Sequence, residues 1–366
     1  VGFGEVWRTA GMQNMEGWGV DTLGSVGFSI WRNGGREGME RIGERLLEVD
    51  PRSCTGSTAS RILFCVTGFL KAPTRDLIYE RYIDKLLGRG MGGREISMGM
   101  RAIARGKGGE FLGIFDSLAK RMAEDKVLLR ATVGEVTGAL WACGKVYALE
   151  DMDGVGPGRM PSYVKSAERM GERMAEMEVN NARSYAMGIW GLSKVGCGVE
   201  GRAGNLIKMG RKLAAKLDSG GCSSVAWSLA KISEREGEAF KREHGGLVKE
   251  VMGRIGARAI HRKVRDRMTT MDASTLMWSY AKVGRGWRRE DEAVMGGMID
   301  IIEEDLRGSS AQTMAIIVWA TERNDGLRMR ARRVFNEWNS EVMGIQGIVT
   351  DMKEEEVKEV AQRFEG

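Results

Sequence analysis

The stretch 270-TMDASTLMWSYAKVG-284 decides the fold. Its apolar residues Ala273, Met277 and Trp278 lie at helical spacing, and the small Ala281 follows on the same face, which predicts a helix. Four other stretches repeat this pattern around a central Trp: 131-ATVGEVTGALWACGKV, 180-NNARSYAMGIWGLSKVG, 218-DSGGCSSVAWSLAKIS and 310-SAQTMAIIVWATER. Several copies of one helical pattern indicate a repeat protein.

Weaker copies extend the series toward the N-terminus. The residues at the Trp position, which we call anchors, are Trp31, Phe64, Arg101, Trp141, Trp190, Trp227, Trp278 and Trp319. A second amphipathic pattern of Leu, Met and Ile follows each anchor, as in 162–177 and 290–306. The base repeat is about 37 to 41 residues, with extra residues at 147–160 and 233–246 that we expect to form loops. A partial copy begins at Glu354.

No stretch alternates with the period of a strand, so the predicted fold is all-α. We expect one α-solenoid over 1–366, built of about eight helical-hairpin repeats of roughly 37–41 residues. A chain of 366 residues is too long for one ordinary core, which agrees with a repeat array.

Composition argues against several classes of protein. The chain lacks an apolar run of 18 residues, so we expect no membrane insertion. Its five Cys are widely spaced, which argues against a metal site or a disulfide framework. It has only two His, His244 and His261, which argues against His-based catalysis. We therefore expect no cofactor, no metal site and no enzymatic activity. The net charge of +6 is compatible with a polyanionic partner.

The repeat resembles a known family. The stretches 139-ALWACGKV, 188-GIWGLSKVG, 225-VAWSLAKIS and 276-LMWSYAKVG look like the octotricopeptide repeats of green-algal organelles, the heptatricopeptide repeats of alveolates and the helical part of FAST-kinase-like proteins. The resemblance implies an α-solenoid that binds RNA in mitochondria or plastids. Many members carry a nuclease-like RAP domain near the C-terminus, and nothing here resembles one, so its catalytic role does not carry over. Gly138, Gly188 and Gly220 depart from the family pattern.

A row of basic residues lies four positions after the anchors. The last six repeats have Arg105, Lys145, Lys194, Lys231, Lys282 and Arg323 there, and the first two have Gly35 and Gly68. Equivalent positions stack along a solenoid, so these side chains would follow a phosphate backbone. The alternative is that they interact with the C-terminal end of each helix.

Six residues before the anchors, a polar column varies in residue type. Its candidates for base contacts are Ser25, Thr58, Glu95, Glu135, Ser184, Asp272 and Thr313. Varied hydrogen-bonding residues at one repeat position are what base readout requires. Helix N-capping is the alternative, since Ser, Thr and Asp are favoured caps.

Two dense basic runs complete the candidates. The run 254-RIGARAIHRKVRDR contributes Arg254, Arg258, Arg262, Lys263 and Arg265, and four of these Arg would share one helix face. The second run is 328-RMRARR. A salt-bridged surface is the alternative for both. We expect the anchor Trp residues to pack in the core, and Trp287 to be the best candidate for an exposed stacking aromatic.

The sequence therefore favours a non-catalytic RNA-binding repeat protein of an organelle. We expect it to be a component of a ribonucleoprotein, such as the mitochondrial ribosome, or a transcript maturation or stability factor. A plastid is the alternative compartment, and the chain starts at Val1 without an apolar targeting segment. The alternative function is a scaffold or accessory subunit that holds protein partners without touching RNA. A third alternative, an enzyme of transcript processing, would need a cluster of carboxylates in the groove that binds the RNA.

Overall fold

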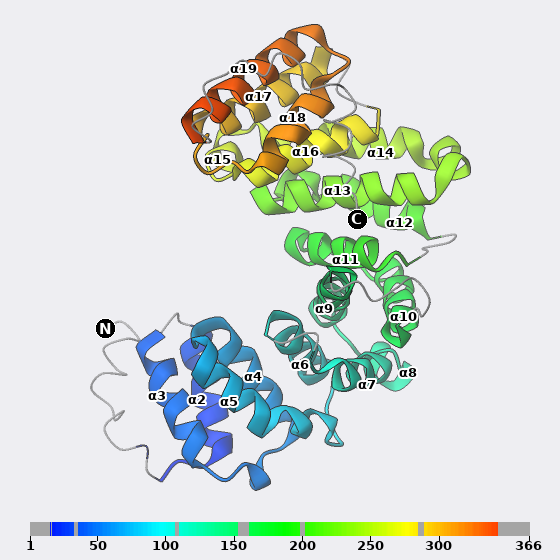
Figure 1. Ribbon diagram of the computed structural model, residues 1–366. Helices are drawn as coiled ribbons and strands as arrows, with labels where there is room; N and C mark the ends of the chain where they lie inside the picture. Colours follow the sequence, from blue (N-terminus) through cyan, green and yellow to red (C-terminus); the bar gives the residue numbers. More distant parts are fainter. Residues whose placement is uncertain are drawn as a thin grey trace. The chain divides into compact units, whose positions relative to one another are not determined.

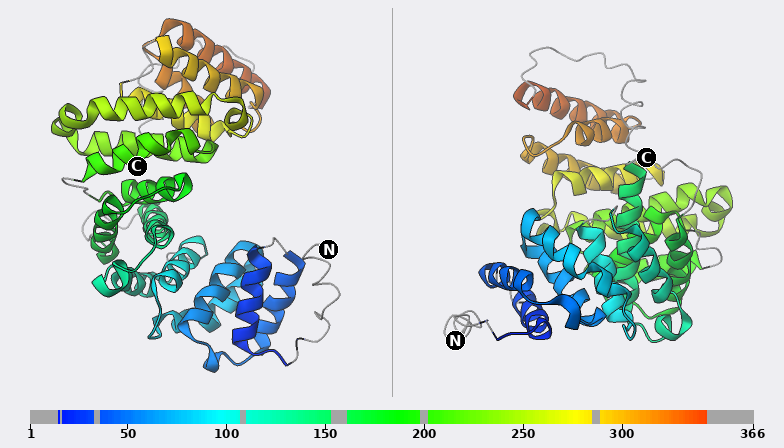
Figure 2. Two further views of the ribbon diagram at one scale, coloured as in Figure 1. Left: turned by 180° about the vertical axis from the view of Figure 1, so that it is seen from behind. Right: turned by 60° about the horizontal axis from the view of Figure 1, so that its bottom comes forward.

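The computed structural model describes residues 15, 17–32, 36–106, 110–152, 161–197, 202–284 and 289–342. Within these residues every regular element is a helix, which confirms the all-α prediction (Figures 1 and 2). The chain divides into two compact units. The N-terminal unit is Val1–Met177 with Lys194–Cys197, and the C-terminal unit is Glu178–Ser193 with Gly198–Gly366.

Every anchor lies in a helix, as the repeat pattern predicts. We call these the anchor helices. They are α2 (Val20–Arg32), α4 (Gly56–Phe69), α6 (Gly93–Arg105), α9 (Val133–Met152), α11 (Ala182–Val195), α13 (Ser219–Arg235), α16 (Thr270–Lys282) and α18 (Ala311–Thr321).

A second helix follows each anchor helix, and we call these the partner helices. They are α3 (Arg36–Glu48), α5 (Ala72–Tyr82), α7 (Leu112–Met122), α10 (Ser162–Glu176), α12 (Ala203–Leu213), α14 (Gly237–Ala259), α17 (Arg289–Glu304) and α19 (Asp325–Val342). Short helices η1 (Pro51–Ser53), η2 (Ile83–Leu87), α8 (Asp125–Leu128), η3 (Ala214–Lys216) and α15 (Arg262–Arg265) lie in the connections. The described residues thus form eight consecutive helix pairs.

One predicted loop is wrong. The extra residues 233–246 extend two helices, because α13 continues to Arg235 and α14 starts at Gly237. The turn between them needs a single residue of positive φ, and Gly237 supplies it at +73°. Of the other predicted loop, 147–152 lies in α9, while 153–160 lie outside the described residues, as do Glu354 and Trp287.

Helix N-caps recur nine residues before the anchors. The caps are Thr55, Gly92, Thr132, Asn181, Asp218, Thr269 and Ser310. Side-chain oxygens of Thr55, Asp218, Thr269 and Ser310 accept a hydrogen bond from the backbone N–H three residues on, at 2.8 to 3.2 Å. These bonds satisfy donors that the first helical turn leaves open. They fix where each anchor helix begins.

Each unit has two layers of helices. In the N-terminal unit α2 packs on α4, α4 on α6 and α6 on α9, while α3 packs on α5 and α7 on α10. In the C-terminal unit α13 packs on α16 and α16 on α18, while α12 packs on α14, α14 on α17 and α17 on α19. Anchor helices thus contact anchor helices and partner helices contact partner helices, which is the local packing of a repeat protein. One continuous solenoid over 1–366 stays a prediction.

Side chains from the partner helices tie successive repeats together. Arg81 Nη2 donates to the Val49 carbonyl at 2.9 Å, Arg121 Nη1 to the Gly88 carbonyl at 3.0 Å, and Arg258 Nε to the Leu217 carbonyl at 2.9 Å. Trp338 Nε1 makes the equivalent bond to the Ser309 carbonyl at 3.1 Å. Each accepting carbonyl lies in the connection that leads into the anchor helix of the donor's own repeat, where no helical N–H reaches it. We call these four bonds the turn clamps.

Candidate nucleic-acid interface

Aromatic and cationic side chains alternate along the anchor helices of the N-terminal unit. The rings of Trp31 and Phe64 meet edge to face with centroids 4.9 Å apart. The guanidinium of Arg101 lies 4.8 Å from the Phe64 centroid. Arg105 lies between Phe64 and Trp141, at 5.4 Å and 5.3 Å from their centroids. We call Trp31, Phe64, Arg101, Arg105 and Trp141 the N-terminal ladder.

Arg101 stands at an anchor position because its neighbour leaves room for it. A Cβ on Gly138 of α9 would approach the Arg101 Cδ to 3.1 Å. The Arg101 stem therefore packs against a glycine surface and its guanidinium reaches the Phe64 ring, a cation–π contact. This explains why Gly138 departs from the repeat pattern.

The C-terminal unit contains a similar arrangement of Lys and Trp. The Nζ atoms of Lys231 and Lys282 lie 5.3 and 5.5 Å from the Trp278 centroid, and Lys282 is also 5.5 Å from the Trp319 centroid. We call Lys231, Trp278, Lys282 and Trp319 the C-terminal ladder. Three residues of the basic row, Arg105, Lys231 and Lys282, therefore lie over anchor rings. An ammonium or guanidinium over an aromatic face is attracted by about 0.5–1 kcal/mol.

The anchors are less buried than the sequence predicts. Phe64 and Trp278 are buried, at 2% and 7% exposed. Trp31, Trp141, Trp190, Trp227 and Trp319 are half-buried. Among these half-buried rings, Trp141 lies beside Arg105 and Trp319 beside Lys282 of the basic row, and partly exposed rings next to cations are a setting in which aromatic side chains contact bases.

Two members of the basic row are not placed to interact with a helix end. Arg105 and Lys282 are the last residues of α6 and α16, where a positive charge complements the helix dipole. Lys145 and Lys231 instead lie well inside α9 and α13. Lys145 and Arg323 are exposed, while Lys194 is half-buried.

The polar column has a structural role in helix capping. Glu95, Glu135 and Asp272 each accept a hydrogen bond from the backbone N–H of the cap residue three positions earlier, at 2.9 to 3.3 Å. Thr58 and Thr313 are buried, at 6% and 4% exposed. These bonds account for the polar character of the column.

Only Ser25 in this column is exposed, and Ser184 is half-buried. The backbone N–H of Ser184 donates to Asn181 Oδ1 at 2.9 Å. Base contacts from this column stay a prediction.

The run at 254–267 does not form one helix face, so that prediction is wrong. Helix α14 ends at Ala259 and α15 starts at Arg262, because His261 adopts an extended conformation between them. Arg254 pairs with Glu250 at 3.0 Å and Arg265 with Glu304 at 2.8 Å. Arg262 and Lys263 are exposed.

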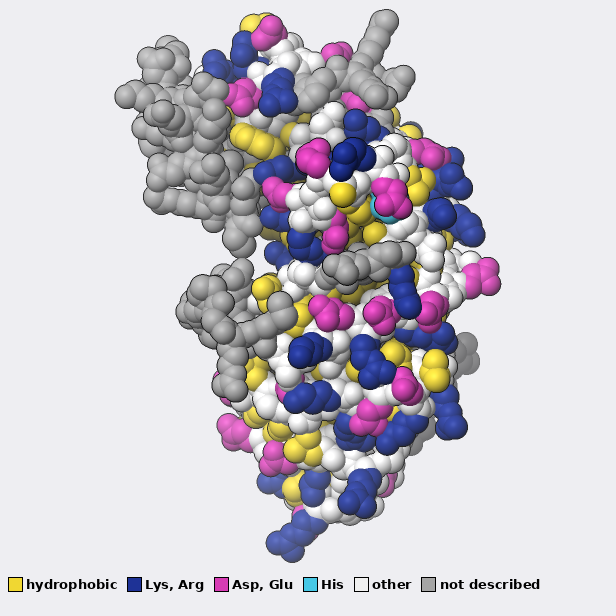
Figure 3. Space-filling view, turned by 90° about the vertical axis from the view of Figure 1, so that its right-hand side faces the viewer, with side chains coloured by type: hydrophobic (Ala, Val, Ile, Leu, Met, Phe, Trp, Pro, Cys, Tyr) yellow, Lys and Arg dark blue, Asp and Glu magenta, His cyan; other side chains and the backbone are white. Residues whose placement is uncertain are grey.

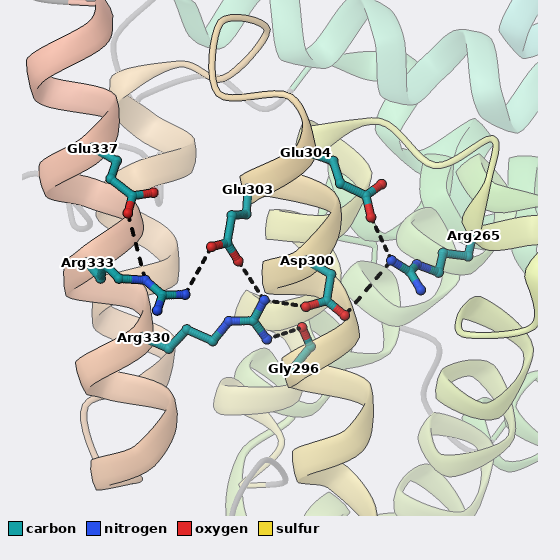
Figure 4. Close-up of polar contacts among 8 residues, drawn as sticks. All are labelled: Arg265, Gly296, Asp300, Glu303, Glu304, Arg330, Arg333 and Glu337. Atoms are coloured by element: carbon teal, nitrogen blue, oxygen red, sulfur yellow. Dashed lines mark hydrogen bonds and ion pairs between the residues drawn. The ribbon is translucent and has the colours of Figure 1, made fainter.

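The run at 328–333 belongs to an ion-pair network across α15, α17 and α19 (Figure 4). Arg330 bonds Asp300 and Glu303, and Arg333 bonds Glu303 at 3.0 Å. Arg330 holds the pKa of the Glu303 carboxyl below its usual value, chiefly through their hydrogen bond. The carboxylates therefore neutralise much of both basic runs.

The face drawn in Figure 3 shows the same balance. Its Lys and Arg side chains lie among Asp and Glu side chains. This face therefore shows no large area of a single charge sign.

The described cysteines show no sign of catalytic chemistry. All five are buried and free of disulfides. Burial raises the pKa of Cys54, Cys65 and Cys222 to about 12 and that of Cys143 further, which keeps these thiols protonated and poorly nucleophilic. Within the described ranges, no group of three or more His, Cys, Asp or Glu is placed to hold a metal ion. None of the described helices is long and apolar enough to cross a membrane.

Two contacts on this surface join different repeats and have no signal in the sequence pattern. The cation–π contact of Arg101 depends on Gly138 from another repeat, and the pairing of Glu234 with Lys282 depends on a contact between α13 and α16. Periodicity within one helix carries no signal for either. No protein-family model and no curated protein sequence matches this chain.

Proposed function

We propose that this protein is a non-catalytic RNA-binding repeat protein and that the two ladders contact RNA. The observation that carries the proposal is the position of Arg105, Lys231 and Lys282 on the aromatic anchors in both units. Cations that follow phosphates and aromatic rings that accept bases are the two components of sequence-tolerant single-strand binding. In the ladders we assign the bases to the half-buried Trp31, Trp141 and Trp319, because Phe64 and Trp278 are buried beneath the cations.

The finer part of the proposal rests on the family resemblance of the Trp helices. On this resemblance we propose that the protein acts in an organelle, either a mitochondrion or alternatively a plastid. There it would act within a ribonucleoprotein such as the mitochondrial ribosome, or as a transcript maturation or stability factor. We favour the ladders over residues 254–267 as the RNA contact, because carboxylates pair with Arg254 and Arg265 of that run.

A protein scaffold is the second candidate function. The network at Arg330 and the mixed charges of Figure 3 favour it, because neutralised charge is typical of a surface without a polyanionic partner. Leu87, Leu129 and Met329 are exposed by 48%, 63% and 70%, and such side chains are available to a protein partner.

Measuring RNA binding at several salt concentrations distinguishes the RNA-binding proposal from the scaffold. Fluorescence anisotropy of a labelled single strand of about 20 nucleotides, between roughly 50 and 200 mM salt, should show affinity that falls linearly on a log–log plot. A duplex of the same length should bind more weakly if the aromatic edges accept bases. A folded protein that binds neither RNA at the lowest salt would contradict the proposal and favour the scaffold.

A further inference from the structure

One carboxylate bridges the two lysines of the C-terminal ladder. Glu234 Oε1 lies 3.2 Å from the Nζ of Lys282, and Glu234 Oε2 lies 3.6 Å from the Nζ of Lys231. Glu234 and Lys231 belong to α13, whereas Lys282 belongs to α16. The two ammonium groups therefore converge on one pair of oxygen atoms from two repeats.

Trp278 holds both lysines in this position. Its ring is only 7% exposed, so it cannot accept a base, and the two ammonium groups lie over it. The lysine side chains are 22% and 20% exposed, which is low for a residue type that usually extends into water. A site with ordered cations binds an anion at a lower entropic cost than flexible surface lysines do.

The bridging carboxylate resembles a phosphodiester in the chemistry it offers. Both groups present two oxygen atoms that share one negative charge, and both accept hydrogen bonds from ammonium groups. Glu234 is 44% exposed, so its oxygens are accessible from solvent and its side chain can rotate away. A phosphate could then take its position without a change in the two helices.

We propose that Lys231 and Lys282, resting on Trp278, form a clamp for one RNA phosphate, and that Glu234 occupies this clamp when RNA is absent. This inference rests on the proposed function and adds to it an intramolecular competitor that lowers the affinity of the C-terminal ladder. Other ladder contacts then decide whether a strand displaces Glu234.

Glu234→Gln tests the clamp, since it removes the charge and keeps the size of the side chain. The full-length variant should bind the labelled single-stranded RNA about three- to tenfold more tightly than the unaltered protein. The gain should disappear when Lys231→Met and Lys282→Met are added. Circular dichroism and thermal unfolding establish that each variant is folded.

Glu250→Gln is the matched control. Glu250 also bridges two cations, Arg254 at 3.0 Å and Arg211 at 3.7 Å, and its exposure of 41% is close to that of Glu234. It lies in α14, in the partner-helix layer of the same unit, and its replacement changes the net charge by the same amount. An equal gain in both variants would mean a general charge effect and would overturn the clamp.

The outcomes distinguish the two proposals. If the unaltered protein binds RNA and Glu234→Gln does not improve binding, RNA binding stands and the clamp is refuted. If only Glu234→Gln binds, the clamp stands, and RNA binding by the unaltered protein is refuted. If neither protein binds, both proposals fail.

Discussion

The hydroxyl of Tyr280 donates a 2.6 Å hydrogen bond to the carbonyl of Met252, and the ring end lies where Gly256 has no side chain. The same relationship occurs twice more. Tyr185 donates to Leu206 at 3.0 Å beside Gly210, and Tyr79 donates to Ala102 at 2.7 Å beside Gly106. In each case the accepting carbonyl precedes the glycine by four residues. Part of the high glycine content thus admits buried tyrosines between helices.

Gly256→Ala should therefore destabilise the protein by about 1–3 kcal/mol, because a methyl group would displace Tyr280 from its bond. The free energy of unfolding in urea measures the effect. Gly246→Ala in the same helix has open space around its Cβ position and should be neutral or stabilising by up to about 1 kcal/mol. Equal changes in the free energy of unfolding from the two substitutions would contradict the close packing of Tyr280 against Gly256.

Arg258 should act on stability through its turn clamp. Arg258→Met keeps the apolar stem but leaves the Leu217 carbonyl without this donor, so we expect a loss of about 1–2 kcal/mol in the free energy of unfolding. Arg254→Met, whose side chain is 56% exposed and paired with Glu250, should change stability by no more than about 0.5 kcal/mol. The same loss of stability from both variants would argue against a special role for the bond between Arg258 and the Leu217 carbonyl.

Glu303 should make the network of Figure 4 sensitive to acid. Its pKa is lowered in the folded protein from an ordinary value of 4.5, so its contribution is complete above that pH and is lost as the pH falls through the lowered pKa. Glu303→Gln should therefore reduce the free energy of unfolding at pH 7 by about 1 kcal/mol and have a smaller effect near pH 3. Urea titrations at the two pH values provide the comparison. A pH-independent effect would contradict the ion-pair assignment.

The buried cysteines should react slowly with thiol reagents. Because burial raises the pKa of Cys54, Cys65 and Cys222 to about 12, the folded protein at pH 8 should resist labelling by a water-soluble disulfide reagent, and denaturant should expose all five thiols. Mass spectrometry after timed labelling identifies each site. Rapid modification of Cys222 in the folded protein would contradict the packing of α13.

The anchor pattern predicts the anchor helices correctly because the apolar face of each helix is set by residues within that helix. Each anchor helix has one apolar face, and the spacing of Ala273, Met277 and Trp278 describes that face without reference to the rest of the chain. The starts of α9 and α16 are also readable from the sequence. Thr269 and Asp272 form a capping box, and the backbone N–H of Thr132 donates to the Glu135 carboxylate three residues on. Glu135 and Asp272 belong to the polar column, for which helix capping is the alternative that the sequence offers.

Contacts between repeats were not predictable in this way. The interruption between Ala259 and Arg262 sits in a run whose Arg spacing fits a continuous helix. The neutralisation of Arg265 by Glu304 joins residues 39 positions apart. Such pairs depend on how neighbouring helices pack, and one sequence gives no information on which charges meet.

The most direct measurement compares two variants of equal charge. The first replaces the four ladder cations, Arg101, Arg105, Lys231 and Lys282, with Gln. The second replaces four cations outside the ladders with Gln: Arg254, Arg262, Lys263 and Arg332. If the ladders bind RNA, the first variant should lose at least about tenfold in affinity and its salt slope should fall by about 3, while the second should change little. Equal losses in the two variants, or an unchanged first variant, would contradict RNA binding by the ladders.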